Sequence, residues 1–397
     1  MVISSMARRR VATNLYDKPL QRFEPRDQDA APSRELTSVI RSRQIVMVCP
    51  RFVCRLLFQG VFLLAAACAA GQQTQSDAPI DDGVRAAVID SLVSKIEASY
   101  VVPVGAQSAV RRLRSAAEAG DYGTLVSARQ FAERITSDLR SVTHDKHIAL
   151  YFDPEAKQGS APGGSTVAPR EHYNYGFNKL ERLPGNVGYL ELRSFANLQE
   201  AKETASTFLS ALANFDSIII DLRQNGGGNT PMIAYVASYF LGPKPVHLTS
   251  MYWRDENRTI EVLTSESVTG RRSLDRDLFL LVGPSTFSAA EDFCFALQQL
   301  KRATLVGERT GGGAHMGRGL QRLSPLFTAF IPTGESINPI TKTNWENVGV
   351  EPDLKVPFEK ALPEAHLAAL RKLLERERDP NWQENLRRSI TELANRK

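Results

Sequence analysis

The chain has 397 residues, 42% of them hydrophobic, which is enough to bury one large or two medium-sized cores. Its formal net charge of +5 arises at the N-terminus, because residues 1–70 carry 11 Lys and Arg against 5 Asp and Glu while the remainder is close to neutral. The main body therefore lacks the basic excess of a nucleic-acid-binding protein, and we expect no nucleic-acid partner.

The N-terminal region predicts an export signal. Arg51 and Arg55 precede an apolar run over residues 56–64, which leads into the small residues 65–71. This order is typical of a signal peptide, and the apolar run is shorter than a membrane span requires. We predict a leader and export signal over 1–71, with a stray hydrophobic anchor as the alternative. An exported bacterial protein, periplasmic or on the outer surface, follows from this reading.

Two details concern how this leader is processed. Cys68 follows three alanines and resembles a bacterial lipoprotein site, so a lipid tether at Cys68 and ordinary cleavage after a small residue are both open. Met47 is a natural start for such a signal, which makes residues 1–46 either an upstream extension or a further leader. One cysteine lies well beyond the signal, so no internal disulfide and no cysteine metal site are expected.

A polar linker is predicted over 72–80 and a small helical domain over 81–145, with three helices, because apolar residues recur there every three or four positions. The pattern turns into a strand near Phe152, and a Gly/Ser/Pro loop follows over 159–169. Strands then alternate with helical stretches from Gly185, which indicates an α/β core over 146–360. A C-terminal helical tail over 361–397 is broken at Asp379 and Pro380.

Two glycine-rich turns follow apolar runs in this core. Residues 217–222 enter the turn at 225–228, and residues 304–307 enter a second one at 311–313. Glycine allows positive φ at such a turn and lets a ligand approach the backbone closely, with N–H groups free to donate. Both turns therefore suit the binding of a developing negative charge.

A third apolar run, over 278–283, leads into a helical pattern at Ser288. A serine at the start of a helix lies beside unpaired N–H groups, which can stabilise an oxyanion. The local pattern fits a second interpretation as well, in which Ser288 is the N-cap and Glu291 completes a capping box.

Together these segments resemble the core of the S41 serine peptidases, within the branch that contains tricorn core protease and interphotoreceptor retinoid-binding protein. The resemblance covers roughly residues 142–357 and rests on the segments 217–229, 285–291, 306–315 and 332–353. It implies a ClpP/crotonase-like α/β core. The PDZ insert of the related C-terminal processing peptidases is not expected, because residues between Phe152 and Gly176 leave no room for it.

The resemblance implies that Ser288 is the nucleophile, with Ser285 as the alternative. In the processing peptidases the base is a lysine at the position of Gly313, so a Ser–Lys dyad is absent here. The tricorn branch uses a histidine instead, and His147 matches it, in competition with His144 and His315.

Glu346 matches the acidic residue of the family, which helps to orient the histidine. In tricorn a serine before the histidine bridges to that glutamate, whereas Lys146 fills the place here. The link to His147 is then direct, or uses another group, or Lys146 itself pairs with Glu346. The implied oxyanion hole consists of the N–H groups of Ala289 and Gly227.

These residues imply an exported serine peptidase that hydrolyses peptide bonds through an acyl-enzyme, with a peptide or protein as substrate. No metal or organic cofactor is implied, and the sequence assigns no oligomeric state. The alternative is an inactive or weakly active hydrophobic-ligand-binding protein, because the retinoid-binding relatives use the same fold as a carrier. A different kind of serine esterase ranks last, since the Gly-x-Ser-x-Gly turn is missing.

Overall fold

A computed structural model describes residues 77–155 and 170–395 of the chain. The predicted leader with Cys68, most of the predicted linker and the loop over 159–169 lie outside the described residues. In the part that is described, no helix has both the length and the apolar character needed to cross a membrane.

The central sheet has six strands in the order β13-β8-β7-β4-β3-β2. All neighbouring strands pair in parallel except β2 and β3, which are antiparallel. Their bounds are Phe177–Leu183 (β2), Val187–Leu192 (β3), Ser217–Asp221 (β4), Asp277–Val282 (β7), Thr304–Gly307 (β8) and Leu354–Lys355 (β13). The parallel strands β4, β7 and β8 end at one edge, and the turns predicted to carry the chemistry leave from that edge.

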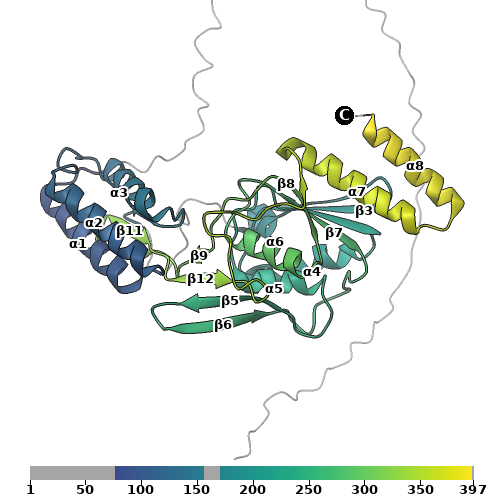
Figure 1. Cartoon of the computed structure of the whole chain (residues 1–397), viewed down its shortest axis with the longest axis horizontal. Helices are drawn as coiled ribbons and strands as arrows, with labels where there is room; N and C mark the ends of the chain where they lie inside the picture. The colour runs from purple at the N-terminus through teal and green to yellow at the C-terminus, as the bar shows by residue number, and fades with distance from the viewer. Residues whose placement is uncertain (1–76, 156–169, 396–397) are drawn as a thin grey trace, which may run out of the picture. The chain divides into compact units, whose positions relative to one another are not determined.

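Helices cover both faces of this sheet (Figure 1). Ile218 and Ile220 of β4 belong to one core with α4, α5 and α6, whereas Ile219 between them packs with α7 on the other face. Successive side chains of a strand point to opposite faces, so an unbroken apolar strand requires cover on both sides. The helices are Leu198–Leu212 (α4), Thr230–Ser238 (α5), Ala289–Gln299 (α6), Ala361–Arg376 (α7) and Pro380–Ala394 (α8).

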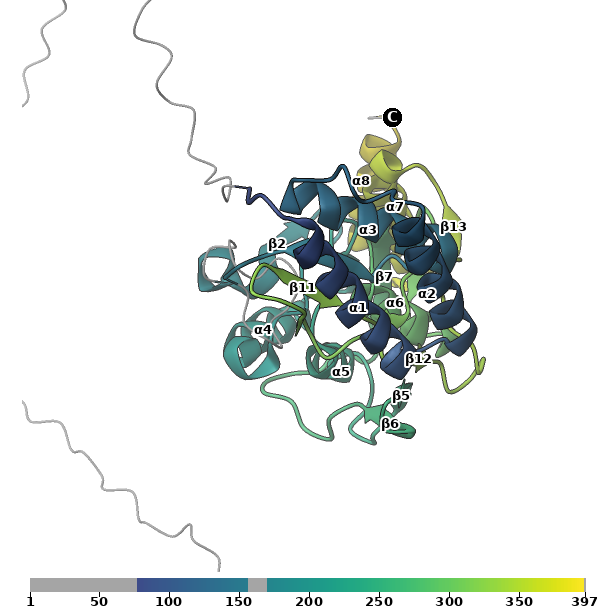
Figure 2. The ribbon, with the colours of Figure 1, turned by 90° about the vertical axis from the view of Figure 1, so that its left-hand side faces the viewer.

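Three N-terminal helices precede the core, as predicted: Asp82–Ser99 (α1), Pro103–Glu118 (α2) and Ala128–Thr143 (α3). Their apolar faces share one core with β1 (Ala149–Phe152) and β11 (Phe327–Phe330). Phe131 of α3 meets Phe327 of β11 edge to face at 5.7 Å between ring centroids, and Figure 2 shows β11 beside α1. A distant segment of the chain thus completes the core of the helical region.

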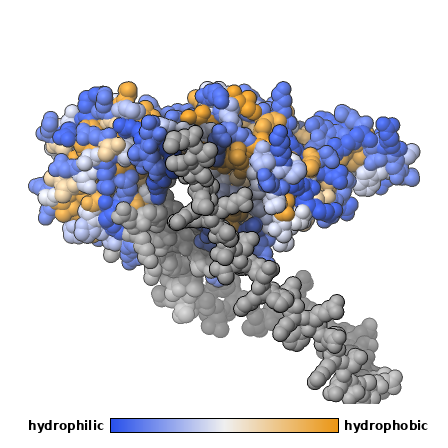
Figure 3. All heavy atoms as spheres, turned by 90° about the horizontal axis from the view of Figure 1, so that it is seen from below, coloured by the Kyte–Doolittle hydropathy of each residue, from blue (hydrophilic) through white to orange (hydrophobic). Residues whose placement is uncertain are grey.

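Two smaller antiparallel sheets connect the helices to the core, with the orders β1-β11-β10 and β6-β5-β12-β9. Their further strands are His247–Trp253 (β5), Arg258–Leu263 (β6), His315–Met316 (β9), Gln321–Arg322 (β10) and Gly334–Ile337 (β12). Short 3-10 helices span Arg170–Gly176 (η1) and Phe358–Lys360 (η2). On the face seen in Figure 3, apolar side chains form separate groups among polar ones. The whole is the mixed α/β fold with N-terminal helices that the sequence predicts.

Candidate active site

Ser288 lies at the sharp turn that joins β7 to α6. Its backbone has φ 55° and ψ −120°, a conformation that residues with a side chain rarely adopt. Thr286 holds the turn, because its hydroxyl donates to the Leu222 carbonyl at 2.8 Å and accepts the Gly283 N–H at 3.0 Å. These hydrogen bonds to the ends of β4 and β7 hold the backbone of Ser288 in its strained conformation. The alternative nucleophile Ser285 is exposed and precedes the turn.

Two buried carboxylates hold the glycine-rich loop that follows β8. Glu291 accepts the N–H groups of residues 312 and 313 at 2.6 and 2.9 Å. Glu346 accepts those of residues 314 and 315 at 2.5 and 3.0 Å. Burial raises the pKa of both carboxyl groups, although the hydrogen bonds that they accept act in the opposite direction. Four successive backbone N–H groups are therefore fixed by two side chains.

Glu291 also connects this loop to the serine turn. Its carboxylate accepts the Ser288 N–H at 2.8 Å and the Thr310 hydroxyl at 2.5 Å. The bond to the Ser288 backbone is the one expected from the capping-box interpretation. Capping and nucleophilic attack do not exclude each other, because the capping role does not use the hydroxyl proton of Ser288.

The glycine turn after β4 packs directly on Ser288. A Cβ atom at Gly227 would lie 2.9 Å from the Ala289 nitrogen and 3.0 Å from the Ser288 Cβ, so position 227 has no space for a side chain. In the described part of the chain the Ala289 N–H has no acceptor. The Gly227 N–H, in contrast, donates to Asn225 Oδ1 at 2.9 Å. Of the two predicted oxyanion donors, the Ala289 N–H is therefore free and the Gly227 N–H already has an acceptor.

His147 lies between α3 and β1, and its ring stacks on Phe287, the residue before Ser288, with 4.6 Å between centroids. The side chain is only 13% exposed, and its Nδ1 is buried without a hydrogen-bond partner. Burial lowers the pKa of His147 to about 4, although the charge of Asp145 raises it. The imidazole is therefore neutral at neutral pH, as a general base requires.

Gly313, the position of the lysine in the processing peptidases, packs against this ring. A Cβ atom there would lie 2.6 Å from His147 Cε1 and 2.3 Å from Phe287 Cζ. The competitor His144 ends α3 in a left-handed conformation with φ 59° and is exposed. Of the candidate histidines, His147 is the one that contacts the serine turn.

The structure does not bring Glu346 to His147, contrary to the role that the resemblance implies. The carboxylate of Glu346 is used by the glycine-rich loop, and its Oε1 lies 3.7 Å from His315 Nδ1 with no hydrogen-bond partner. Lys146 does not pair with Glu346 either, because its ammonium group donates to the Gly311 carbonyl. Glu346 thus faces the other histidine of the site.

Asp145 is the carboxylate beside His147, and the sequence analysis did not single it out. Its Oδ1 accepts the His147 backbone N–H at 2.8 Å and lies 3.9 Å from His147 Nδ1. Its Oδ2 accepts the Tyr100 hydroxyl at 3.0 Å and the His315 Nδ1–H at 2.8 Å. The signal that could have revealed it is its place two residues before His147.

Asp145, His315 and Glu346 offer ligand atoms within 4.8 Å of one another, a spacing and a donor set that a divalent metal ion could use. His315 Nδ1 and Asp145 Oδ2 already share a hydrogen bond, however, so two of the three atoms have partners. The geometry is that of a buried ionic cluster, and no step of the chemistry below uses a metal.

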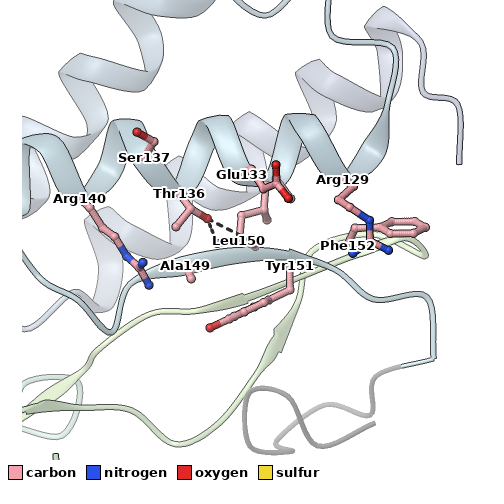
Figure 4. A pocket seen from close by; sticks show the side chains of 10 residues that line it. Arg129, Glu133, Thr136, Ser137, Arg140, Ala149, Leu150, Tyr151 and Phe152 are labelled. Atoms are coloured by element: carbon pink, nitrogen blue, oxygen red, sulfur yellow. Dashed lines mark hydrogen bonds between the residues drawn. The ribbon is translucent and has the colours of Figure 1, made fainter. Parts of the chain in front are cut away.

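A cavity of about 580 Å³ lies between α3 and β1 (Figure 4). Glu133 and Arg140 of α3 line it together with Tyr151 of β1. The Thr136 hydroxyl donates to the Leu150 carbonyl at 3.1 Å and accepts the Leu150 N–H at 2.9 Å, which closes the outer edge of β1. A lining with charged side chains of both signs does not suit an apolar ligand.

Parts of this chain are similar in sequence to known peptidases. Residues 186–356 match the model of the family described as peptidase family S41. The carboxyl-terminal-processing protease of Picosynechococcus sp. is 30% identical over 192 residues, which cover 46% of this chain and 42% of that protein. The chloroplastic carboxyl-terminal-processing peptidase 2 of Arabidopsis thaliana is 26% identical over 188 residues, which cover 45% and 35%. The chain spans less than half the length of these relatives.

Solved structures with a similar arrangement include the photosystem II D1 C-terminal processing protease. It is 16% identical, the match covers 70% of this chain and 94% of that one, and the TM-score is 0.46. The tricorn protease is 13% identical, with 78% and 37% covered and a TM-score of 0.41. Ser288, Gly227 and Glu346 lie inside the range that matches the family, whereas His147 and Asp145 precede it.

Proposed function

We propose that this chain is a serine peptidase, because residues 186–356 match the model of peptidase family S41. Ser288 is the proposed nucleophile and His147 the proposed general base. The observation that carries the proposal is the packing of a neutral, buried His147 ring on Phe287, the residue before the strained Ser288. A serine hydroxyl is inert without such a base.

In the proposed reaction the Ser288 oxygen attacks the carbonyl carbon of a peptide bond while His147 takes the hydroxyl proton. We assign Nε2 to this transfer, because Nδ1 is buried on the side of Asp145. The imidazolium then gives the proton to the leaving amine, and a water molecule hydrolyses the acyl-enzyme by the same route in reverse. The substrate class is a peptide or a protein.

The Ala289 N–H at the start of α6 is the proposed first donor to the oxyanion, since it is free and adjacent to Ser288. The Gly227 N–H is the proposed second donor. It must then be shared with, or released by, Asn225 Oδ1, to which it donates at 2.9 Å. Use of the second donor therefore changes the hydrogen bond between Gly227 and Asn225, while the turn itself stays packed on Ser288.

The first test is covalent labelling of the full chain with a fluorophosphonate, read by intact mass. We expect the wild-type chain to be labelled and Ser288→Ala to remain unlabelled. The peptidase activity of Ser288→Ala should be lower than that of the wild type by a factor on the order of 10⁴–10⁶. His147→Ala tests the base, and Ser285→Ala is the matched control because Ser285 is exposed and lies just before the turn at Ser288.

A folded wild-type chain that is neither labelled nor able to cleave a peptide library would contradict this assignment. That outcome would favour the apolar-ligand-binding alternative, which the charged lining of the cavity at α3 does not support. The library also reports whether cleavage is internal or at the carboxyl terminus.

We further propose export of the protein to the periplasm or outer surface, supported by the leader pattern over 1–71. Lipidation at Cys68 and simple cleavage predict different mature masses. Mass spectrometry of the protein recovered from a bacterial host, with Cys68→Ser alongside, distinguishes them. Recovery of uncleaved chain in the cytoplasm would contradict export.

A further inference from the structure

The catalytic histidine needs a partner for Nδ1, and the structure offers one carboxylate at that position. Asp145 Oδ1 lies 3.9 Å from His147 Nδ1 and holds the His147 backbone N–H at 2.8 Å. In the described residues no other carboxylate oxygen lies within 4.0 Å of a His147 ring nitrogen. At 3.9 Å the carboxylate accepts no hydrogen bond from Nδ1, but its negative charge favours the imidazolium that forms.

Asp145 is itself held from two directions. Its side chain is fully buried, and Oδ2 accepts hydrogen bonds from Tyr100, at the end of α1, and from His315, at the start of β9. The bond to His315 joins positions 170 residues apart in the chain. Because Oδ2 is committed to these donors, Oδ1 is the oxygen left for His147.

The charges of the cluster favour a cationic His315. Burial by itself lowers the pKa of His315, but the hydrogen bond to Asp145 and the charges of Asp145, Glu346 and Glu335 outweigh it and raise the pKa. Glu346 Oε1 faces His315 Nδ1 at 3.7 Å, and Glu335 of β12 lies opposite His315 in the sheet. Burial raises the pKa of Asp145, but the bond and charge of His315 prevail and lower it. Asp145 and His315 thus shift each other's pKa in the directions that favour an ion pair beside His147.

We propose that Asp145 orients the catalytic His147, and that His315, braced by Glu346, is the positioning residue that holds Asp145 in place. This inference rests on the proposed peptidase function. It extends the site from Ser288 and His147 to a chain of contacts that reaches β9 and the loop between β12 and β13. Glu346 then acts on His147 only through His315 and the loop, which explains why it stands away from the base.

The first arm of the test is the rate of fluorophosphonate labelling of the full chain against pH. We expect Asp145→Asn to lower the rate on the order of 10²–10⁴-fold at neutral pH. We expect His315→Gln to lower it less and to move the acid limb to higher pH, because the His315 charge lowers the pKa of His147. A merely structural role would lower the rate at every pH without moving the limb.

The second arm does not depend on enzymatic activity. It measures the pKa of each histidine in the same variants by NMR titration of the Cε1–H signals. Asp145→Asn should lower the pKa of His147, since the Asp145 charge raises it, and His315→Gln should raise it. His366→Gln is the matched control, because His366 is buried on α7 and bonds to the Pro184 carbonyl. It should leave both the labelling profile and the His147 titration unchanged.

The two arms separate the possible failures. In one outcome the wild-type chain is not labelled, but Asp145→Asn and His315→Gln still shift the His147 titration. This outcome would contradict the peptidase proposal and would support the contacts of Asp145 with His147 and His315. In another outcome, Asp145→Asn and His315→Gln are folded and keep both the labelling profile and the His147 titration of the wild type. This outcome would overturn the inference. Melting temperatures within a few degrees of the wild type establish that the variants are folded.

Discussion

A Cβ atom added to Gly313 would lie 2.6 Å from Cε1 of His147, closer than such atoms approach one another in proteins. The histidine ring therefore fills the space that any side chain at position 313 requires. The space that the lysine of the processing peptidases would need at this position is occupied by His147, the base that we propose. Phe287 closes the same space from the serine side, at 2.3 Å from the added atom.

The first prediction follows from this contact. Gly313→Ala should displace the His147 ring and reduce fluorophosphonate labelling by about 100-fold, since misplacing a base by about 1 Å has an effect of that order. The overpacking should cost about 1–3 kcal/mol in the free energy of unfolding. Gly313→Lys should be no better, because the lysine expels His147 instead of restoring a dyad.

The control for this prediction is Gly242→Ala, since a Cβ atom at position 242 meets nothing within 4 Å. Its labelling rate and unfolding free energy should match those of the wild type within error. Wild-type labelling by Gly313→Ala would show that the base is not where we place it.

The second prediction concerns pH. The pKa of His147 is about 4 in the folded chain and near 6.5 when unfolded, so the unfolded chain binds more protons between these values. Stability from this group is present above about pH 6.5 and is lost as the pH falls towards 4, by about 3 kcal/mol in total. Urea unfolding at pH 7, 5.5 and 4 measures it, with His147→Gln as the reference chain that lacks the effect.

Activity should follow a different curve from stability. Labelling requires neutral His147, so its rate should be flat from pH 7 down to about 5 and fall only near pH 4. An acid limb with a midpoint near 6.5 would mean that the base is exposed to solvent, in conflict with its 13% exposure.

Local patterns predicted much of this arrangement. The strand-to-helix turn at Ser288 and the glycine turn at Gly227 were recognisable because each depends on residues close together in the chain. The N-terminal helices followed from the spacing of apolar residues. Their shared core with β11 could not be predicted in this way, because pairing β1 with β11 joins segments far apart in sequence.

The partners of the histidines illustrate the same limit. Asp145, in the segment between α3 and β1, meets His315 of β9 only through the fold, and nothing near either residue in the sequence indicates the contact. Glu346 matched the pattern of an acidic residue, but backbone N–H groups of residues 314 and 315 take its carboxylate. A motif indicates the type of residue at a site, while the neighbouring backbone decides what that residue binds.

The third prediction concerns Glu291, whose buried carboxylate accepts three backbone N–H groups and the Thr310 hydroxyl. Glu291→Gln keeps the size of the side chain but turns one acceptor into a donor that faces N–H groups. Leaving one or two buried donors unpaired should cost about 2–4 kcal/mol. Labelling should fall as well, because the Ser288 turn and the loop at Gly313 lose their common anchor.

Chemical denaturation measures this cost, with Glu351→Gln as the control. Glu351 is 40% exposed and pairs with Arg309 and Lys355 at the surface, so its substitution should change stability much less than Glu291→Gln does. Equal effects of the two substitutions would contradict the role of Glu291 as the anchor.

The last prediction tests the turn after β4. Gly227 has φ 107°, and a Cβ atom there would meet the Ala289 nitrogen and the Phe287 carbonyl oxygen at 2.9 Å each. Gly227→Ala is therefore strained in its backbone and blocked by the serine turn itself. We expect a loss of about 2–4 kcal/mol in stability, from strain of about 1–3 kcal/mol and the displaced contact. Labelling by a fluorophosphonate should be abolished, because the added methyl group would displace the Ala289 N–H, the proposed first oxyanion donor.

The neighbouring Gly226 supplies the control for this substitution. A Cβ atom at Gly226 meets nothing within 4 Å, and its φ is not in the left-handed region. Gly226→Ala should therefore melt within a degree or two of the wild type, although both substitutions add one methyl group to the same turn. If Gly227→Ala has the melting temperature and labelling rate of Gly226→Ala, the turn can move away from Ser288 at little cost. The proposed oxyanion site would then not depend on the packing of this turn against Ser288.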